Sequence, residues 1–214
     1  MKNFIKIENN IVKKTFTNEC DFLTEYHFYL EHKEFHFIPK LLGVEKSTIH
    51  LEHIKGQNMY AIGTQQQLLL AKTLAEFHSF NHFNKSLTLD TNASSYLNLL
   101  HYDTNLKNYI YCGTKIYMID FTDITIGNPM YDVYSVMLFF CETHHSDVFN
   151  DFLNSFLEVY MNTSKICCVH SLDILYHEIE RLEKRREEKG KSIYNYKHYI
   201  KNKDTFKKKI ESLL

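Results

Sequence analysis

The sequence predicts an α+β protein with two lobes, a small β-rich lobe over residues 1–55 and a mostly helical lobe over residues 56–214. Short runs of β-branched and aromatic residues dominate the first lobe, which is typical of strands. Beyond Gly56, apolar residues recur three and four positions apart in long segments, as they do along one face of a helix. The stretch "IKGQNM" around Gly56 interrupts both patterns, and it predicts a connector between the lobes.

The first lobe is predicted to hold a small, mostly antiparallel sheet and one helix. Strands at residues 4–7 and 11–16 flank the turn-forming cluster "ENN", which predicts a β-hairpin. The segment 20–32, "CDFLTEYHFYLEH", has the apolar spacing of a helix. Two further strands are predicted at residues 37–45 and 47–54.

The second lobe is predicted to combine several helices with one β-hairpin. Within residues 109–120, the apolar runs "YIY" and "IYMID" flank the tight-turn sequence "CGTK". Helices are predicted at residues 65–80, 94–100, 131–142, 147–161 and 171–188.

Composition excludes several classes of protein. The net charge of −1 gives no general reason to expect nucleic acid or an acidic membrane as partner. The chain has no apolar run near the ~20 residues of a membrane-spanning helix, and its first ten residues lack the apolar centre of a signal peptide. We therefore expect a cytoplasmic protein with reduced cysteines. The adjacent Cys167 and Cys168 lack the gap that lets a cysteine pair hold zinc.

The segment "HYDTNLKNYIYCGTKIYMIDF" carries the polar residues that form a candidate site. Asp103 and Asn108 lie in a loop, and Asp120 follows twelve residues after Asn108 at the end of the predicted hairpin. Because a hairpin returns the chain, Asp120 is expected beside this loop. Asn108 and Asp120 offer the hard oxygen ligands that Mg²⁺ takes, whereas Asp103, kept free of metal, could orient a hydroxyl and accept its proton. Phosphoryl transfer requires these groups.

The same segment resembles a known superfamily. The pattern H-x-D-x-x-x-x-N from His101, a hairpin and then "IDF" is similar to the catalytic and metal-binding segments of the protein-kinase-like superfamily. "GNPMYD", ending at Asp132, and the helix end "LAEFH" are similar to the branch of aminoglycoside phosphotransferases and choline kinases. The resemblance implies a bilobal fold with a reduced antiparallel N-lobe, a structural His101, and an Asp132 that braces the catalytic loop. Tyr102 departs from the branch, which usually has Gly there.

The resemblance also implies roles for residues of the first lobe. Such kinases hold the α- and β-phosphates with a strand Lys that a helix Glu positions. "NIVKKTF" offers Lys13 and Lys14 on opposite faces of a strand, and we assign Lys13, with Lys14 as the alternative. Glu25 is the helix Glu. Glu52 and Ile54, in "IHLEHIKG", are the expected contacts to adenine.

The implied function is ATP- and Mg²⁺-dependent transfer of a phosphoryl group to the hydroxyl of a small molecule. Asp103 would be the base, Asn108 and Asp120 the metal ligands, and Lys13 with Glu25 the phosphate clamp. Two alternatives stay open. A compact atypical protein kinase or ATPase acting in a complex fits the short chain, and a binding-only pseudokinase fits the absence of Gly from residues 1–42, where a Gly-rich loop would cover the phosphates.

A basic segment lies near the C-terminal end. Residues 189–209 contain eight Lys and one acidic residue, Asp204, with Tyr residues interleaved. Such a charge run is most often a solvated face. The alternative hypothesis is a contact surface for RNA or a partner protein. A polyanion would bind to this surface through release of counterions.

Overall fold

The computed structural model describes residues 3–80, 98–164, 169–190 and 198–214. The chain divides into two compact units that alternate along the sequence. Unit 1 consists of residues 1–62 and 107–124, and unit 2 of residues 63–106 and 125–214. The division of the lobes between residues 55 and 56 stays a prediction.

Unit 1 is built on a four-stranded antiparallel sheet with the order β1-β2-β4-β3. Its strands are β1 (Phe4–Glu8), β2 (Ile11–Thr15), β3 (Leu41–Glu45) and β4 (Thr48–Glu52). The turn between β1 and β2 is closed by Asn9 and Asn10, both with positive φ. A two-residue hairpin turn needs this left-handed conformation, and Asn tolerates it better than most residues do.

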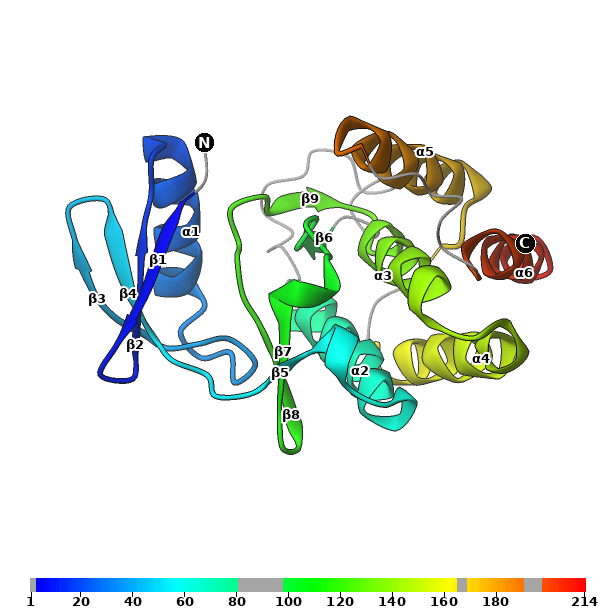
Figure 1. Cartoon of the computed structure of the whole chain (residues 1–214), viewed down its shortest axis with the longest axis horizontal. Helices are drawn as coiled ribbons and strands as arrows, with labels where there is room; N and C mark the ends of the chain where they lie inside the picture. Colours follow the sequence, from blue (N-terminus) through cyan, green and yellow to red (C-terminus); the bar gives the residue numbers. More distant parts are fainter. Residues whose placement is uncertain (1–2, 81–97, 165–168, 191–197) are drawn as a thin grey trace, which may run out of the picture. The chain divides into compact units, whose positions relative to one another are not determined.

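Helix α1 (Glu19–Glu31) connects β2 to β3 and packs against this sheet (Figure 1). Asn18 caps it, because its side chain accepts a hydrogen bond from the backbone N–H of Cys20. The buried residues of α1 are Glu25, Phe28 and Tyr29. Their spacing of three and four residues places Glu25 on the same helix face as the aromatic core.

The rest of unit 1 is a three-stranded sheet with the order β5-β7-β8. Its strands are β5 (Gln57–Asn58), β7 (Tyr109–Cys112) and β8 (Lys115–Met118), and the 3-10 turn η1 (Met59–Ala61) follows β5. The 3-10 turn η4 (Leu106–Asn108) begins at the last residue before the second segment of unit 1. The β7–β8 hairpin turns at Gly113, where φ is +68°. Gly56 is needed at its position because a Cβ atom there would lie 2.3 Å from the carbonyl oxygen of Tyr111.

Unit 2 contains five helices and a two-stranded β6–β9 pair among the residues that the structure describes. Helix α3 is almost entirely buried, and it packs against α2, α5 and α6. The elements are α2 (Thr64–Phe80), β6 (Asn98–Leu100), β9 (Thr125–Gly127), α3 (Met130–Thr143), α4 (Ser146–Thr163), α5 (Leu172–Glu188) and α6 (Tyr199–Glu211).

The predicted fold class is confirmed: the protein is α+β, with an antiparallel sheet near its N-terminus and a mostly helical remainder. The prediction of a short helix at residues 94–100 is wrong for residues 98–100, which the structure describes. Residues 98–100 form strand β6, because Leu99 and Leu100 pair with Ile126 and Thr125 of β9. Residues 94–97, like Cys167 and Cys168, lie outside the described residues. None of the helices in the described ranges is long and apolar enough to span a bilayer.

Candidate active site

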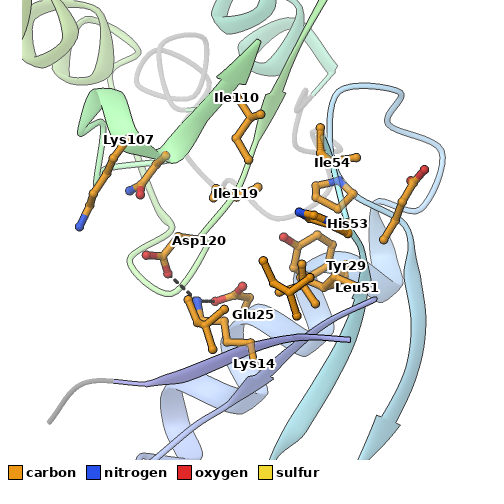
Figure 2. A pocket seen from close by; sticks show the side chains of 16 residues that line it. Lys14, Glu25, Tyr29, Leu51, His53, Ile54, Lys107, Ile110, Ile119 and Asp120 are labelled. Carbon is orange, nitrogen blue, oxygen red and sulfur yellow. Dashed lines mark hydrogen bonds and ion pairs between the residues drawn. The ribbon is translucent and has the colours of Figure 1, made fainter. Parts of the chain in front are cut away.

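Three charged side chains of unit 1 form a cluster of two ion pairs that share one lysine. The Nζ atom of Lys14 lies 2.6 Å from Oε2 of Glu25 and 2.6 Å from Oδ1 of Asp120. Figure 2 shows both carboxylates pointing at this ammonium group. The side chains of Lys14 and Glu25 are only 6% and 1% exposed. Strand β2, helix α1 and the segment after β8 each contribute one member.

The partner of Glu25 is therefore Lys14, and the assignment of Lys13 is corrected. Neighbouring residues of a strand point to opposite faces of the sheet. Lys14 and Val12 share the face toward α1, whereas Lys13 is 39% exposed and pairs with Glu8 of β1 at 2.9 Å. Each face of β2 carries one apolar residue and one Lys, so the strand pattern alone could not select between them.

Burial and charge set the protonation of this cluster. Burial alone would lower the pKa of Lys14, but the charges of Glu25 and Asp120 outweigh it and raise the pKa, so the ammonium stays charged. Burial raises the pKa of Glu25 to about 7, against the opposing effect of Lys14. The second oxygen of Glu25, Oε1, is buried without a hydrogen-bond partner among the described residues, which further disfavours its anion.

The β7–β8 hairpin brings Asp120 back beside Asn108. The backbone N–H of Ile119 donates to the carbonyl oxygen of Asn108 at 3.0 Å, and both Asn108 and Asp120 line the same cavity. Asp120 has a φ of +68°, an uncommon conformation for a residue with a side chain. The Thr122 hydroxyl donates to Oδ1 of Asp120 at 3.0 Å.

A cavity of 340 Å³ within unit 1 joins these groups. Of the predicted site residues, Glu25, Glu52, Ile54, Asn108 and Asp120 line it, and Lys14 does so in place of Lys13. Most of the apolar residues that line the cavity were not predicted, because the sequence does not show which side of a strand faces a cavity. The lining residues that were not predicted are Ile5, Ile7, Tyr29, Pro39, Leu51, His53, Lys107, Ile110 and Ile119. Val12, two residues before Lys14, also lines the cavity.

Unit 2 holds the loop that carries Asp103, and the buried Asp132 fixes this loop. The Oδ2 and Oδ1 atoms of Asp132 accept hydrogen bonds from the backbone N–H groups of His101 at 2.7 Å and Tyr102 at 2.9 Å. Asp132 Oδ2 also lies 3.1 Å from Nε2 of His78, and Nδ1 of His78 lies 2.7 Å from the Tyr160 hydroxyl. Burial would raise the pKa of Asp132, but His78 and the loop N–H groups outweigh it and lower the pKa. The carboxylate can therefore stay ionised in the core.

Tyr102 adopts the conformation that a Gly would adopt without cost. Its φ is +65°, and the N–H of Asp103 donates to the carbonyl oxygen of His101 at 2.8 Å across it. A tight turn of this kind with positive φ is strained, by roughly 1–2 kcal/mol for a residue with a side chain. Arg181 of α5 offsets the strain, because its guanidinium lies 4.6 Å from the Tyr102 ring centroid and donates to the Tyr102 carbonyl at 3.3 Å.

Asp103 itself has an ionic neighbour that the sequence did not reveal. Arg185 of α5 has its NH1 atom 3.7 Å from Oδ1 of Asp103. Neither Arg181 nor Arg185 was predicted as a site residue. The run "ERLEKRREE" has the pattern of a solvated helix face, and the two arginines are more than 75 residues beyond the loop.

Known proteins resemble the chain in part of its sequence and in its fold. Residues 65–163 match the model of the phosphotransferase enzyme family (APH). No curated protein sequence matches the chain. Among solved structures, a choline kinase from Streptococcus pneumoniae is 17% identical, with 98% of this chain and 89% of that chain covered and a TM-score of 0.59.

Two further structures show the same fold. A choline/ethanolamine kinase family protein from Mesorhizobium loti is 11% identical, with 100% of this chain and 90% of that chain covered and a TM-score of 0.56. An ADP-bound aminoglycoside phosphotransferase is 14% identical, with 97% and 92% covered and a TM-score of 0.54. The protein thus has the fold of these kinases. The predicted resemblance to the branch of aminoglycoside phosphotransferases and choline kinases is confirmed, in sequence over residues 65–163 and in the fold.

The raised pKa of Glu25 predicts a pH-dependent stability for the protein free of nucleotide and metal. The unfolded carboxyl ionises near 4.5, whereas the folded one keeps its proton up to about 7. Stability is therefore expected to fall as pH rises across this interval, by on the order of 3 kcal/mol. Urea unfolding at about pH 5 and about pH 8 measures this loss.

Two variants isolate the contribution of Glu25. Glu25→Gln is expected to remove most of the pH-dependent loss, whereas Glu31→Gln, at an exposed position of α1, is expected to keep it. Equal pH dependence in the wild type and Glu25→Gln would contradict a protonated Glu25.

Proposed function

We propose that the protein is a phosphotransferase that uses ATP and Mg²⁺ to phosphorylate the hydroxyl of a small molecule. The observation that carries this proposal is the Lys14 ammonium, which two carboxylates hold at the polar end of the unit 1 cavity. The family match and the fold of the choline kinase and aminoglycoside phosphotransferase structures support the same class of reaction.

The chemistry of the cavity wall suits a nucleotide. Its volume of 340 Å³ lies in the range of small-molecule sites, and isoleucines from three separate segments give it an apolar lining for a planar base. Ile5 and Ile7 of β1 line the cavity and are still 65% and 55% exposed, so a bound base would cover surface that now contacts water. Glu52, the last residue of β4, and Ile54 both line the cavity, and we expect backbone groups of this segment to contact the base.

The polar residues of the cavity suit phosphates and a magnesium ion. Lys14 supplies a fixed positive charge for phosphate oxygens, and Glu25 holds that charge in place. Asp120 and Asn108 supply a carboxylate and an amide oxygen, and Mg²⁺ commonly binds one or two such groups together with phosphates and water. When bound there, the ion would neutralise charge on the phosphates during transfer.

Asp103 is the proposed base of the reaction. Its carboxylate would orient the acceptor hydroxyl and take its proton while the hydroxyl oxygen forms a bond to the γ-phosphorus and the bond to the ADP oxygen breaks. The strained turn at Tyr102 and the hydrogen bonds to Asp132 fix the backbone from which this carboxylate projects. A fixed base loses little freedom when substrate binds, and this favours catalysis.

Nucleotide binding is expected to depend on Lys14 and not on Lys13. With ATP and Mg²⁺ at a hundredfold excess over the dissociation constant, thermal unfolding should show a stabilisation of about 2.7 kcal/mol. Lys14→Met is expected to remove most of this stabilisation, because the phosphates lose their cation. Lys13→Met changes the adjacent residue on the opposite face and is expected to retain it. Loss on changing Lys13 instead, or no stabilisation of the wild type, would contradict the proposed nucleotide site.

Turnover is expected to depend on Asp103 while nucleotide binding does not. Asp103→Asn keeps the shape of the side chain but cannot accept the proton, so the rate of ADP formation in the presence of alcohols should fall about 100- to 10,000-fold. The stabilisation by ATP should be unchanged. Asp173→Asn, which alters an exposed carboxylate at the start of α5, is the control. Full turnover in Asp103→Asn would exclude Asp103 as the base.

The same measurements separate the two alternative functions. Stabilisation by ATP without any ADP formation would favour a protein that only binds nucleotide. Autophosphorylation, or ADP formation that no alcohol accelerates, would favour a compact protein kinase or ATPase. A contact of residues 189–209 with RNA or protein stays a prediction.

A further inference from the structure

Helix α5 carries three arginines within six residues, and their surroundings differ. Arg181 donates to Glu178, Ser135 and the Tyr102 carbonyl. Arg186 pairs with Glu142, which lies on α3. Both guanidinium groups therefore have a carboxylate partner for their charge within the protein.

Arg185 lacks such partners. Its side chain is 42% exposed, and its one ion pair within the described parts of the chain is the contact to Asp103 at 3.7 Å. That distance exceeds the length of a hydrogen bond, and no hydrogen bond of Arg185 to another described residue is found. A guanidinium has five N–H donors in a planar fork that matches carboxylate and phosphate groups. Arg185 thus presents positive charge and donors beside the proposed base.

The place of this charge restricts what the base can accept as substrate. An acceptor hydroxyl must come within about 3 Å of the Asp103 carboxylate for proton transfer. The rest of a small acceptor then lies within a few ångströms of Arg185. At that separation, near a protein surface, a positive group on the acceptor is repelled and a negative group is attracted. Choline, the substrate in the name of the Streptococcus pneumoniae kinase, is a cation.

We infer that the acceptor is an alcohol with an anionic group, a carboxylate or a phosphate, and that Arg185 is the residue that selects it. This inference rests on the proposed phosphotransfer function. Arg185 binds the anionic group of the acceptor while Asp103 takes the proton of its hydroxyl. Cationic alcohols are repelled by the charge of Arg185, because Glu178 and Glu142 pair with Arg181 and Arg186 and leave Asp103 as the ionic neighbour of Arg185 among the described residues.

The experiment compares acceptors that are matched in size and differ in charge. ADP formation from ATP and Mg²⁺ is measured with glycerate and glycerol phosphate as anionic alcohols, glycerol as the neutral one, and choline as the cationic one. One or both anionic alcohols are expected to accelerate ADP formation by the wild type, and choline is not. Acceleration by glycerate alone would identify the anionic group as a carboxylate, and acceleration by glycerol phosphate alone would identify it as a phosphate.

Variants of α5 test whether Arg185 is responsible. Arg185→Gln is expected to raise KM for the anionic alcohol by on the order of 10- to 100-fold, with a smaller change in kcat, because a hydrogen-bonded ion pair is lost. Arg185→Glu is expected to lose the anionic alcohol and to gain measurable turnover of choline, an effect that a merely structural role would not produce. Lys184→Gln, at the adjacent exposed position, is the control and should behave as the wild type.

Each outcome separates this inference from the proposed function. Lys14-dependent stabilisation by ATP tests the nucleotide site without any acceptor. If it is present, the inference is overturned by acceleration with choline or glycerol equal to that with the anionic alcohols, by unchanged KM in Arg185→Gln, or by no acceleration with either anionic alcohol. If the stabilisation itself is absent, the proposed function fails first.

Discussion

The structure of unit 1 around the cavity depends on one buried lysine. Its ammonium group lies between two carboxylates. Lys14, Glu25 and Asp120 come from a strand, a helix and the end of a hairpin, so one ion cluster fixes three segments relative to one another. Burying a charge is costly unless it is paired, and removing one member of a buried pair typically costs about 3–5 kcal/mol. Two carboxylates share one cation here, and burial raises the pKa of Glu25.

Unit 2 uses a buried carboxylate in a different way. Asp132 has backbone N–H donors and His78 as partners, and it serves to hold the loop around Tyr102 and Asp103 in place. The tight turn of this loop requires a positive φ at Tyr102, which is strained for a residue with a side chain. Arg181 packs on the Tyr102 ring. The bulky side chain is therefore compatible with the turn because α5 supports it. The same helix places Arg185 near Asp103, so the loop geometry and the proposed selection of the acceptor both depend on α5.

The fold class, most of the helices and the order of the polar residues of the candidate site could be predicted from the sequence. The turn "CGTK" predicted the hairpin that returns Asp120 to Asn108, because local turn chemistry determines it. Features that depend on tertiary packing could not be predicted. The face of β2 that meets α1 decides between Lys13 and Lys14, and each face offers the same kind of residues. Residues 98–100 have the composition of a helix and form strand β6 because β9 is available to pair with them. The arginines of α5 contact a loop that is distant in sequence, and no local pattern marks them.

The proposed nucleotide and metal site is best tested by a crystal structure of the chain with Mg²⁺ and a non-hydrolysable ATP analogue. We expect the adenine base among Ile5, Ile7 and Ile54, and the metal ion bound by Asp120 and Asn108. The Lys14 ammonium should contact phosphate oxygens while Glu25 stays in contact with it. A nucleotide bound away from Lys14, or a metal ion without Asp120 among its ligands, would contradict it.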